Sequence, residues 1–162
     1  MTTIDKKIIK NSIITPDGTE LISRSVWDYV EHLDTKTNFK YAVDGGNYYI
    51  RRVCEKDDYQ ETSVFSDDPF ELIRLHYCRG TLDHKNKKRL WIPLYLMSTD
   101  HLYACLIYNK EIVKVKEPSF ANQMYREELK FRREHNIYIA DYDYTDEELR
   151  SKYDIFSKNI GK

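Results

Sequence analysis

The side chains able to do chemistry are scattered along the sequence and form no recognisable metal-binding motif. The histidines are His32, His76, His84, His101 and His135, and the cysteines are Cys54, Cys78 and Cys105. No CxxC, HxH or HExxH spacing occurs. His76 and Cys78 are two apart on a predicted helix, so they point to different sides of it. We therefore expect no native metal site and no cofactor.

Motifs for nucleophilic catalysis and for phosphate binding are missing as well. The sequence has no GxSxG elbow, no Walker loop and no GxGxxG fingerprint. Cys105 falls on the apolar side of a predicted helix, which favours packing over reactivity. Acidic pairs such as Asp67/Asp68 and Asp141/Asp143 are expected in a chain with 27 acidic residues. No residue is assigned as catalytic, and the sequence favours a protein that is not an enzyme without excluding an activity.

The stretch YAVDGGNYYIRR, residues 41–52, is the most distinctive in the chain. Gly45 and Gly46 can take positive φ at no steric cost, which predicts a hairpin turn. The two glycines lead into a strand rather than a helix, so a phosphate-binding loop is disfavoured. We expect both glycines to serve the turn.

Strand periodicity places aromatic and basic side chains together near this turn. Tyr49 and Arg51 alternate onto one face, whereas Arg52 falls on the other. In SVWDYVEH, Trp27 and Tyr29 also share a face. Proteins that bind single-stranded nucleic acids use aromatic rings beside basic residues on a sheet. The alternative, which we favour from the sequence, is that this face lies beneath the helical half of the chain.

The candidate binding residues follow from this stretch and from the neighbouring strand. They are Trp27, Tyr29, Asp44, Tyr49, Arg51 and Arg52. The sequence leaves open whether they form a binding surface or part of the core.

The elements that position these residues predict an α+β fold. Residues 6–53 are typical of an antiparallel meander of four or five strands, in which TPDG at 15–18 suits a type I turn. Residues 66–160 predict about four helices. We expect one domain over residues 1–162, with strands mainly before residue 54 and helices mainly after residue 66.

The helix signals are local. Asp68 and Pro69 begin the first predicted helix and Gly80 ends it. Ser98 is the expected N-cap of the second. The third covers PSFANQMYREELKFRREHN, residues 118–136, and the fourth begins with a capping box in TDEELRSKYDIFSKNIG, residues 145–161.

Composition excludes some classes of protein. The formal net charge is −1, from 26 basic and 27 acidic residues, whereas non-specific DNA binders carry a positive excess. No apolar run approaches the roughly 18 residues of a membrane span. The three separated cysteines indicate reduced thiols in a cytosolic protein. Fourteen tyrosines favour a protein with a binding surface, since Tyr combines a large ring with a polar tip.

The chain resembles small accessory proteins of tailed bacteriophages over roughly residues 8–140. The resemblance is carried by IITPDGTELISRSVWDYVEH and YAVDGGNYYIRR, with SDDPFELIR, WIPLYLMSTDHLYACL and MYREELKFRREHNIYI further along. Some similar modules carry paired cysteines around the first turn and before VDGG, like a small zinc ribbon. This chain has TPDG at the first turn and no cysteine there, which implies the hairpins without the metal. The resemblance implies a setting in an infected host cell and assigns no catalytic residue.

Three hypotheses for function remain. The first is a phage accessory protein that binds a host protein in the host cytoplasm, for host takeover or counter-defence. The second is a nucleic-acid-binding protein that uses the Tyr/Arg sheet face and the HKNKKR loop, residues 84–89. The third is a nucleotide-binding protein or enzyme, with Asp44 and His101 as acid and base. No interaction with a membrane is expected.

Overall fold

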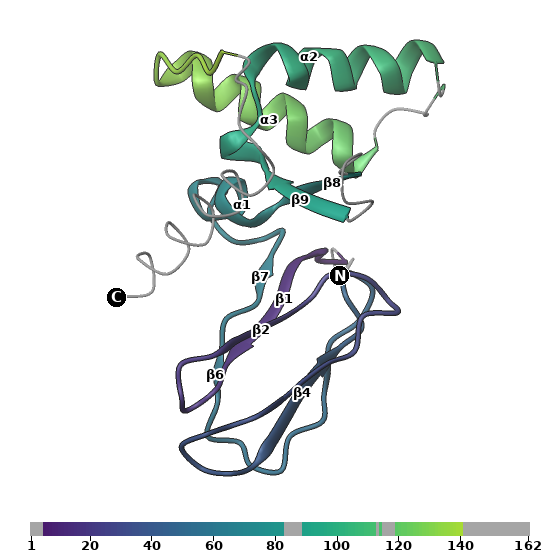
Figure 1. Ribbon diagram of the computed structural model, residues 1–162. Helices are drawn as coiled ribbons and strands as arrows, with labels where there is room; N and C mark the ends of the chain where they lie inside the picture. Colours follow the sequence, from purple (N-terminus) through teal and green to yellow (C-terminus); the bar gives the residue numbers. More distant parts are fainter. Residues whose placement is uncertain (1–4, 83–88, 113, 115–118, 141–162) are drawn as a thin grey trace. The chain divides into compact units, whose positions relative to one another are not determined.

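The computed structural model describes residues 5–82, 89–112, 114 and 119–140 (Figure 1). The chain divides into two compact units, Met1–His76 and Tyr77–Lys162. We describe each unit by itself. The predicted single domain over residues 1–162 stays a prediction.

The first unit consists of short antiparallel strands followed by one helix. The strands are β1 (Ile8–Ile14), β2 (Glu20–Ser23), β3 (Val30–Leu33), β4 (Lys40–Asp44), β5 (Arg51–Arg52), β6 (Gln60–Glu61) and β7 (Val64–Phe65), and the helix is α1 (Phe70–His76). One sheet has the order β2-β1-β6, with β7 also paired to β1, and the other has the order β3-β4-β5. Figure 1 shows β1, β2 and β4 as neighbouring parts of this unit.

The core of the first unit lies between its two sheets. Ile13 and Leu21 come from one sheet and Tyr41 and Val43 from the other, and these four side chains form one buried cluster. In β4, Tyr41 and Val43 have relative exposures of 0%. Because side chains alternate along a strand, the inward side of β4 is fixed by these two residues.

Five strands precede residue 54, where four or five were predicted, and the α+β class is confirmed. The predicted N-terminal antiparallel meander is confirmed as well, although its strands are divided between two sheets. Strands also follow residue 54, since the chain returns to pair β6 and β7 with β1. Such pairings join residues about 50 positions apart, and local periodicity carries no information about them.

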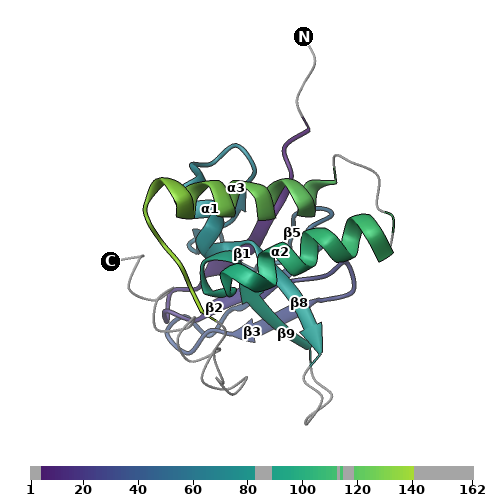
Figure 2. The ribbon, with the colours of Figure 1, turned by 90° about the horizontal axis from the view of Figure 1, so that it is seen from above.

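The described residues of the second unit form a β-hairpin, two α-helices and two short helical turns. Its elements are β8 (Cys78–Leu82), β9 (Arg89–Pro93), the 3₁₀ turn η1 (Leu94–Leu96), α2 (Thr99–Ile107), the π-helical turn η2 (Tyr108–Ile112) and α3 (Phe120–Glu134). As predicted, the Ser98 hydroxyl caps α2 by accepting the backbone N–H of His101 at 3.1 Å. Figures 1 and 2 both show α2 and α3 beside each other.

Two predictions about the helical half need correction. Gly80 does not end a helix, because α1 stops at His76 and Gly80 pairs with Trp91 in the β8–β9 hairpin. The described residues contain three α-helices rather than about four. The helix predicted from Thr145 lies outside the described residues.

A buried ion pair holds the second unit together, and the sequence did not reveal it. Arg132 and Glu128 on α3 have relative exposures of 2% and 0%, and the Arg132 Nε donates to Glu128 Oε1 at 2.8 Å. Arg132 also donates to Thr99 Oγ1 at 3.0 Å and to the carbonyl of Leu94 at 2.8 Å. The guanidinium therefore links α3 to the start of α2. None of the described helices is long and apolar enough to cross a membrane.

Candidate functional site

The register of the β3-β4-β5 sheet brings three of the predicted binding residues into one row. Asp44 pairs with Arg51, and Val30 pairs with Val43, so Tyr29 falls beside Asp44 one position further along. The Arg51 Nη1 lies 3.5 Å from Asp44 Oδ2. The Tyr29 hydroxyl donates to Glu31 Oε2 at 3.4 Å. These contacts place Tyr29, Asp44 and Arg51 on the face opposite the core.

Arg52 points to the other face, as the strand period predicts. Its side chain is 12% exposed, whereas that of Arg51 is 62% exposed. Arg52 donates to Asn11 Oδ1 at 2.7 Å, to Glu61 Oε2 at 3.0 Å and to Ser63 Oγ at 3.0 Å. It therefore links the two sheets, and we do not include it in the binding surface.

The glycine pair serves the turn, as predicted, with φ of 101° at Gly45 and 54° at Gly46. A Cβ on Gly46 would lie 2.3 Å from the carbonyl carbon of Ser25. The Gly46 N–H also donates to Ser23 Oγ at 2.9 Å. The absence of a side chain at Gly46 therefore lets the β4–β5 turn lie directly against the β2–β3 turn.

The β2–β3 turn carries Trp27, and this corrects one prediction. Trp27 does not lie on a strand, because β3 begins only at Val30. The Asp28 N–H donates to the Ser25 carbonyl at 2.9 Å, and the Asp28 carboxylate accepts the Arg24 N–H at 2.9 Å. These two bonds close a tight turn, and Trp27 stands on it.

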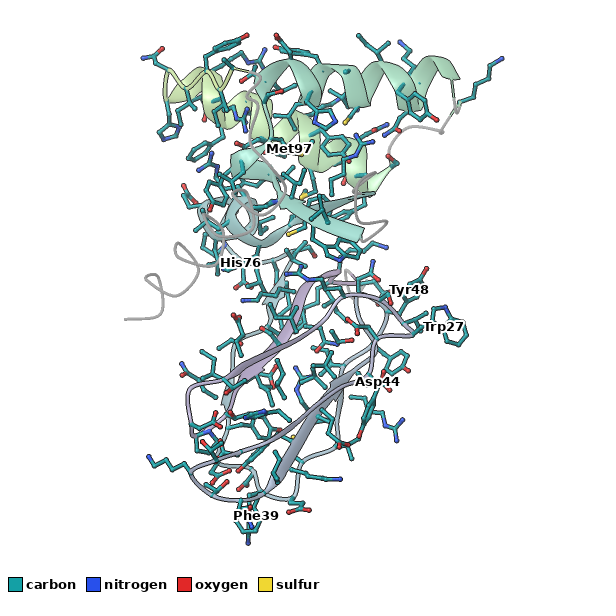
Figure 3. All side chains as sticks on the ribbon, in the orientation of Figure 1. Trp27, Phe39, Asp44, Tyr48, His76 and Met97 are labelled. Atoms are coloured by element: carbon teal, nitrogen blue, oxygen red, sulfur yellow. The ribbon has the colours of Figure 1, made fainter. Side chains whose placement is uncertain are left out.

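Four aromatic side chains are exposed around the two touching turns. Their relative exposures are 91% for Trp27, 75% for Tyr48, 47% for Tyr29 and 44% for Tyr49. Figure 3 shows Trp27 and Tyr48 projecting outward at the same corner of the first unit. We call Trp27, Tyr29, Tyr48 and Tyr49 the aromatic surface.

The predicted burial of this face beneath helices is not seen within the first unit. Its helix, α1, makes its main contacts with β1 and β7. The exposed aromatic rings therefore do not form part of this unit's own core.

The charges beside the aromatic surface balance one another. Arg51 pairs with Asp44, and Lys40 Nζ lies 3.3 Å from Glu31 Oε1. Each cation on the outer face of the sheet thus has a carboxylate neighbour. The face offers apolar rings and neutral ion pairs rather than excess positive charge.

The opposite end of the same sheet holds a polar cluster that the sequence did not predict. Asp17, His32 and Asp34 bring one ligand-type atom each within 4.8 Å of one another. His32 Nε2 lies 2.8 Å from Asp17 Oδ2, and the Asp17 N–H donates to Asp34 Oδ1 at 2.8 Å. The cluster joins the turn at residues 15–18 to the turn at residues 34–38. These residues lie up to 17 positions apart in the sequence, and their spacing does not predict the contact.

Hydrogen bonds already occupy the carboxylates of this cluster. Asp17 accepts from Thr15, from Thr19, from His32 and twice from Thr35. Asp34 accepts from Asp17, from Lys36 and twice from Thr37. Because a carboxylate has about four lone-pair sites, little acceptor capacity remains for a cation. The geometry suits a hydrogen-bonded link between two turns, and the expectation of no bound zinc stays a prediction.

Both carboxyl groups of the cluster are held ionised by their donors. Hydrogen bonds from Thr19, Thr35, His32 and Thr15 place the pKa of Asp17 far below its ordinary value. Burial raises the pKa of Asp34, but hydrogen bonds from Thr37 and Asp17 outweigh burial and leave that pKa lowered.

The residues considered for nucleotide chemistry belong to different units. Asp44 lies in the first unit and His101 in the second, and a site formed by the two stays a prediction. Cys105 is 3% exposed, and burial raises the pKa of its thiol despite the nearby Arg79 guanidinium. Packing, as predicted, accounts for Cys105.

A hollow of about 340 Å³ is lined by Arg52, Cys54, Glu55, Lys56, Asp57 and Tyr59.

Comparisons with known proteins assign no family. No protein-family model, curated protein or solved structure significantly matches this chain.

Proposed function

We propose that this chain is a non-enzymatic binding protein that recognises a partner protein through the aromatic surface. The observation that carries the proposal is the exposure of Trp27, at 91%, beside Tyr48, at 75%, on two turns that touch. Trp and Tyr are enriched among the residues that dominate protein interfaces, because they bury a large area at a small entropic cost. Hydrogen bonds within the turn fix the backbone that carries Trp27, which reduces the ordering cost of binding.

The charge distribution favours a protein partner over a nucleic acid. Nucleic-acid affinity depends on cations that neutralise phosphates. On the outer face of the sheet, Arg51 and Lys40 each already have a carboxylate neighbour. The net charge of −1 adds no general attraction to phosphate. An apolar partner surface, in contrast, gains from burial of the four rings without displacing these ion pairs.

The setting that we propose comes from the resemblance to accessory proteins of tailed bacteriophages. In that setting the partner is a host protein in the cytoplasm of the infected cell, and the interaction serves host takeover or counter-defence. The proposal needs no cofactor and no metal.

Affinity capture with matched variants tests the proposal. We expect wild-type protein to retain a host protein after nuclease treatment, and the double variant Trp27→Ala/Tyr48→Ala to lose it. Tyr103→Ala is the matched control, because Tyr103 is 47% exposed on α2 of the other unit. All three proteins should show the same thermal unfolding midpoint for the first unit, since exposed side chains contribute little to stability.

Two outcomes would contradict the proposal. The first is equal capture by wild type and by the double variant, which would show that the aromatic surface does not bind the partner. The second is the loss of every partner on nuclease treatment. If the logarithm of the binding constant also falls with the logarithm of the salt concentration at a slope of roughly −0.7 per phosphate contact, the partner is a single-stranded nucleic acid. Binding to a protein through apolar rings should depend much less on salt.

A further inference from the structure

The hydrogen-bond register of β3 shows which of its backbone groups point away from β4. The Asp34 N–H donates to the Phe39 carbonyl at 2.9 Å, one position beyond the pair Leu33–Lys40. Hydrogen-bonded and non-hydrogen-bonded pairs alternate in an antiparallel ladder. Val30 and His32 therefore bond to β4, whereas the N–H and C=O groups of Glu31 and Leu33 point outward.

These outward groups form an open edge. β3 is the end strand of its sheet. Within the described residues, no hydrogen bond reaches the backbone N–H or C=O of Glu31 or Leu33. Leu33 is 52% exposed, and the Glu31 side chain is 44% exposed. An edge strand with exposed side chains of this kind is a template for pairing with another strand.

The other edge of the same sheet is different. On β5, the Arg52 side chain reaches Glu61 and Ser63 of the neighbouring segment. That edge is tied to the second sheet of the first unit by a charged side chain. Of the two edges, β3 has the greater access to a partner.

We propose that the partner protein binds with an extended segment added as a strand to the free edge of β3. This inference rests on the proposed function and names the form in which the partner is recognised. Main-chain hydrogen bonds to Glu31 and Leu33 would supply affinity, and side chains on the outer face would supply specificity. Because Tyr29 precedes β3, an added strand runs toward the aromatic surface.

The outer face of β3 defines the chemistry of that segment. Its row reads Tyr29, Glu31, Leu33, which is apolar, acidic, apolar. Cross-strand neighbours on one face interact most favourably when apolar residues meet and opposite charges meet. The matching segment therefore has a basic residue between two apolar ones at alternate positions, and this residue would share the Glu31 carboxylate with Lys40, whose Nζ lies 3.3 Å from Glu31 Oε1. A second copy of β3 centred on the same residue would place Glu31 opposite Glu31, and like charges there are unfavourable.

Selection of peptides from a library of random twelve-residue sequences tests this inference. We expect selected peptides to share an apolar-x-basic-x-apolar pattern. Glu31→Pro removes the outward N–H without removing a bond to β4, and proline is tolerated at such an edge position. Glu31→Ala is the matched control, since it removes the same carboxylate and keeps the N–H. We expect Glu31→Pro to bind the selected peptides about tenfold or more weakly than Glu31→Ala. The reason is that proline removes one main-chain hydrogen bond to the added strand and disturbs the geometry of its neighbours.

Amide hydrogen exchange of the wild-type protein provides a second measurement that does not depend on the proline variant folding. Without peptide, the amides of Val30 and His32 should exchange slowly and those of Glu31 and Leu33 rapidly. With a selected peptide, Glu31 and Leu33 should become protected as well. Unchanged rapid exchange at both positions in the peptide complex would overturn strand addition.

The variants separate failure of this inference from failure of the proposed function. Peptides that lose affinity for Trp27→Ala but not for Glu31→Pro would overturn strand addition and leave the aromatic surface in place. Peptides sensitive to Glu31→Pro alone would support strand addition and remove the aromatic surface from the interface. Selected peptides indifferent to both substitutions, or a selection that yields none, would overturn both.

Discussion

The two ends of the β3–β4 hairpin differ in how their side chains are satisfied. At one end, the carboxylates of Asp17 and Asp34 accept hydrogen bonds from the residues of two turns. At the other end, Trp27 and Tyr48 stand on two touching turns and remain largely exposed. When polar groups make all their hydrogen bonds within the protein, their contribution to folding is enough to account for them. Folding does not account for large apolar side chains that stay exposed to water, and such groups mark binding surfaces.

The contact between the two turns at the aromatic end depends on Gly46, and substituting it should produce the largest effect. We expect Gly46→Val to destabilise the first unit by about 3 kcal/mol or more, from backbone strain at positive φ and from overlap with the Ser25 backbone. Gly18→Ala is the control, because φ is 88° there and nothing lies within 4 Å of the added Cβ. It should cost only about 1 kcal/mol. Urea unfolding measures both, and equal losses would show that the turn contact is unimportant.

Much of the fold was predictable, because it follows from local rules. The glycine turn, the strand alternation that separates Arg51 from Arg52, and the Ser98 cap were all recognised from neighbouring residues. The placement of Trp27 was missed because two hydrogen bonds of Asp28, one from its backbone N–H and one to its carboxylate, close the turn before β3 begins.

What could not be predicted depends on contacts between distant residues. The return of β6 and β7 to pair with β1 joins residues far apart in the sequence. The cluster of Asp17 and Asp34 forms only when two turns meet. At the candidate site, the residue types were found from sequence, but their exposure was not, since exposure depends on what the rest of the chain covers.

Substitutions of Arg51 and Arg52, the adjacent arginines of β5, should differ in their effect on stability, because the two side chains lie on opposite faces of the sheet. We expect Arg52→Ala to destabilise the first unit by about 2 kcal/mol, since it removes charge-assisted hydrogen bonds and leaves Asn11 without that donor. Arg51→Ala should cost less, about 1 kcal/mol or below, because Arg51 is 62% exposed and makes one long ion pair of 3.5 Å, although its partner Asp44 is only 11% exposed. Chemical denaturation of the two variants provides the comparison. Similar losses for both would mean that Arg51 is structural and that the outer face is less free than its exposure indicates.

The smallest expected effect is a change in how stability responds to acid at the polar end. The folded-state pKa of Asp17 lies far below its unfolded value, which is about 3.9. A lowered carboxyl pKa gives stability that is fully present above the unfolded pKa and is lost as pH falls toward the folded pKa. Asp17→Asn keeps the shape of the side chain and one acceptor oxygen but cannot titrate. The free energy of unfolding should therefore fall less steeply between pH 5 and pH 2 in the variant than in wild type, as followed by urea denaturation at each pH. Trp27→Ala should leave the wild-type slope unchanged, because Trp27 does not titrate and lies at the other end of the hairpin. Parallel slopes for wild type and Asp17→Asn would show that the hydrogen bonds to this carboxylate persist in the unfolded chain or contribute nothing, and the contrast between a satisfied end and an exposed end would lose its physical basis.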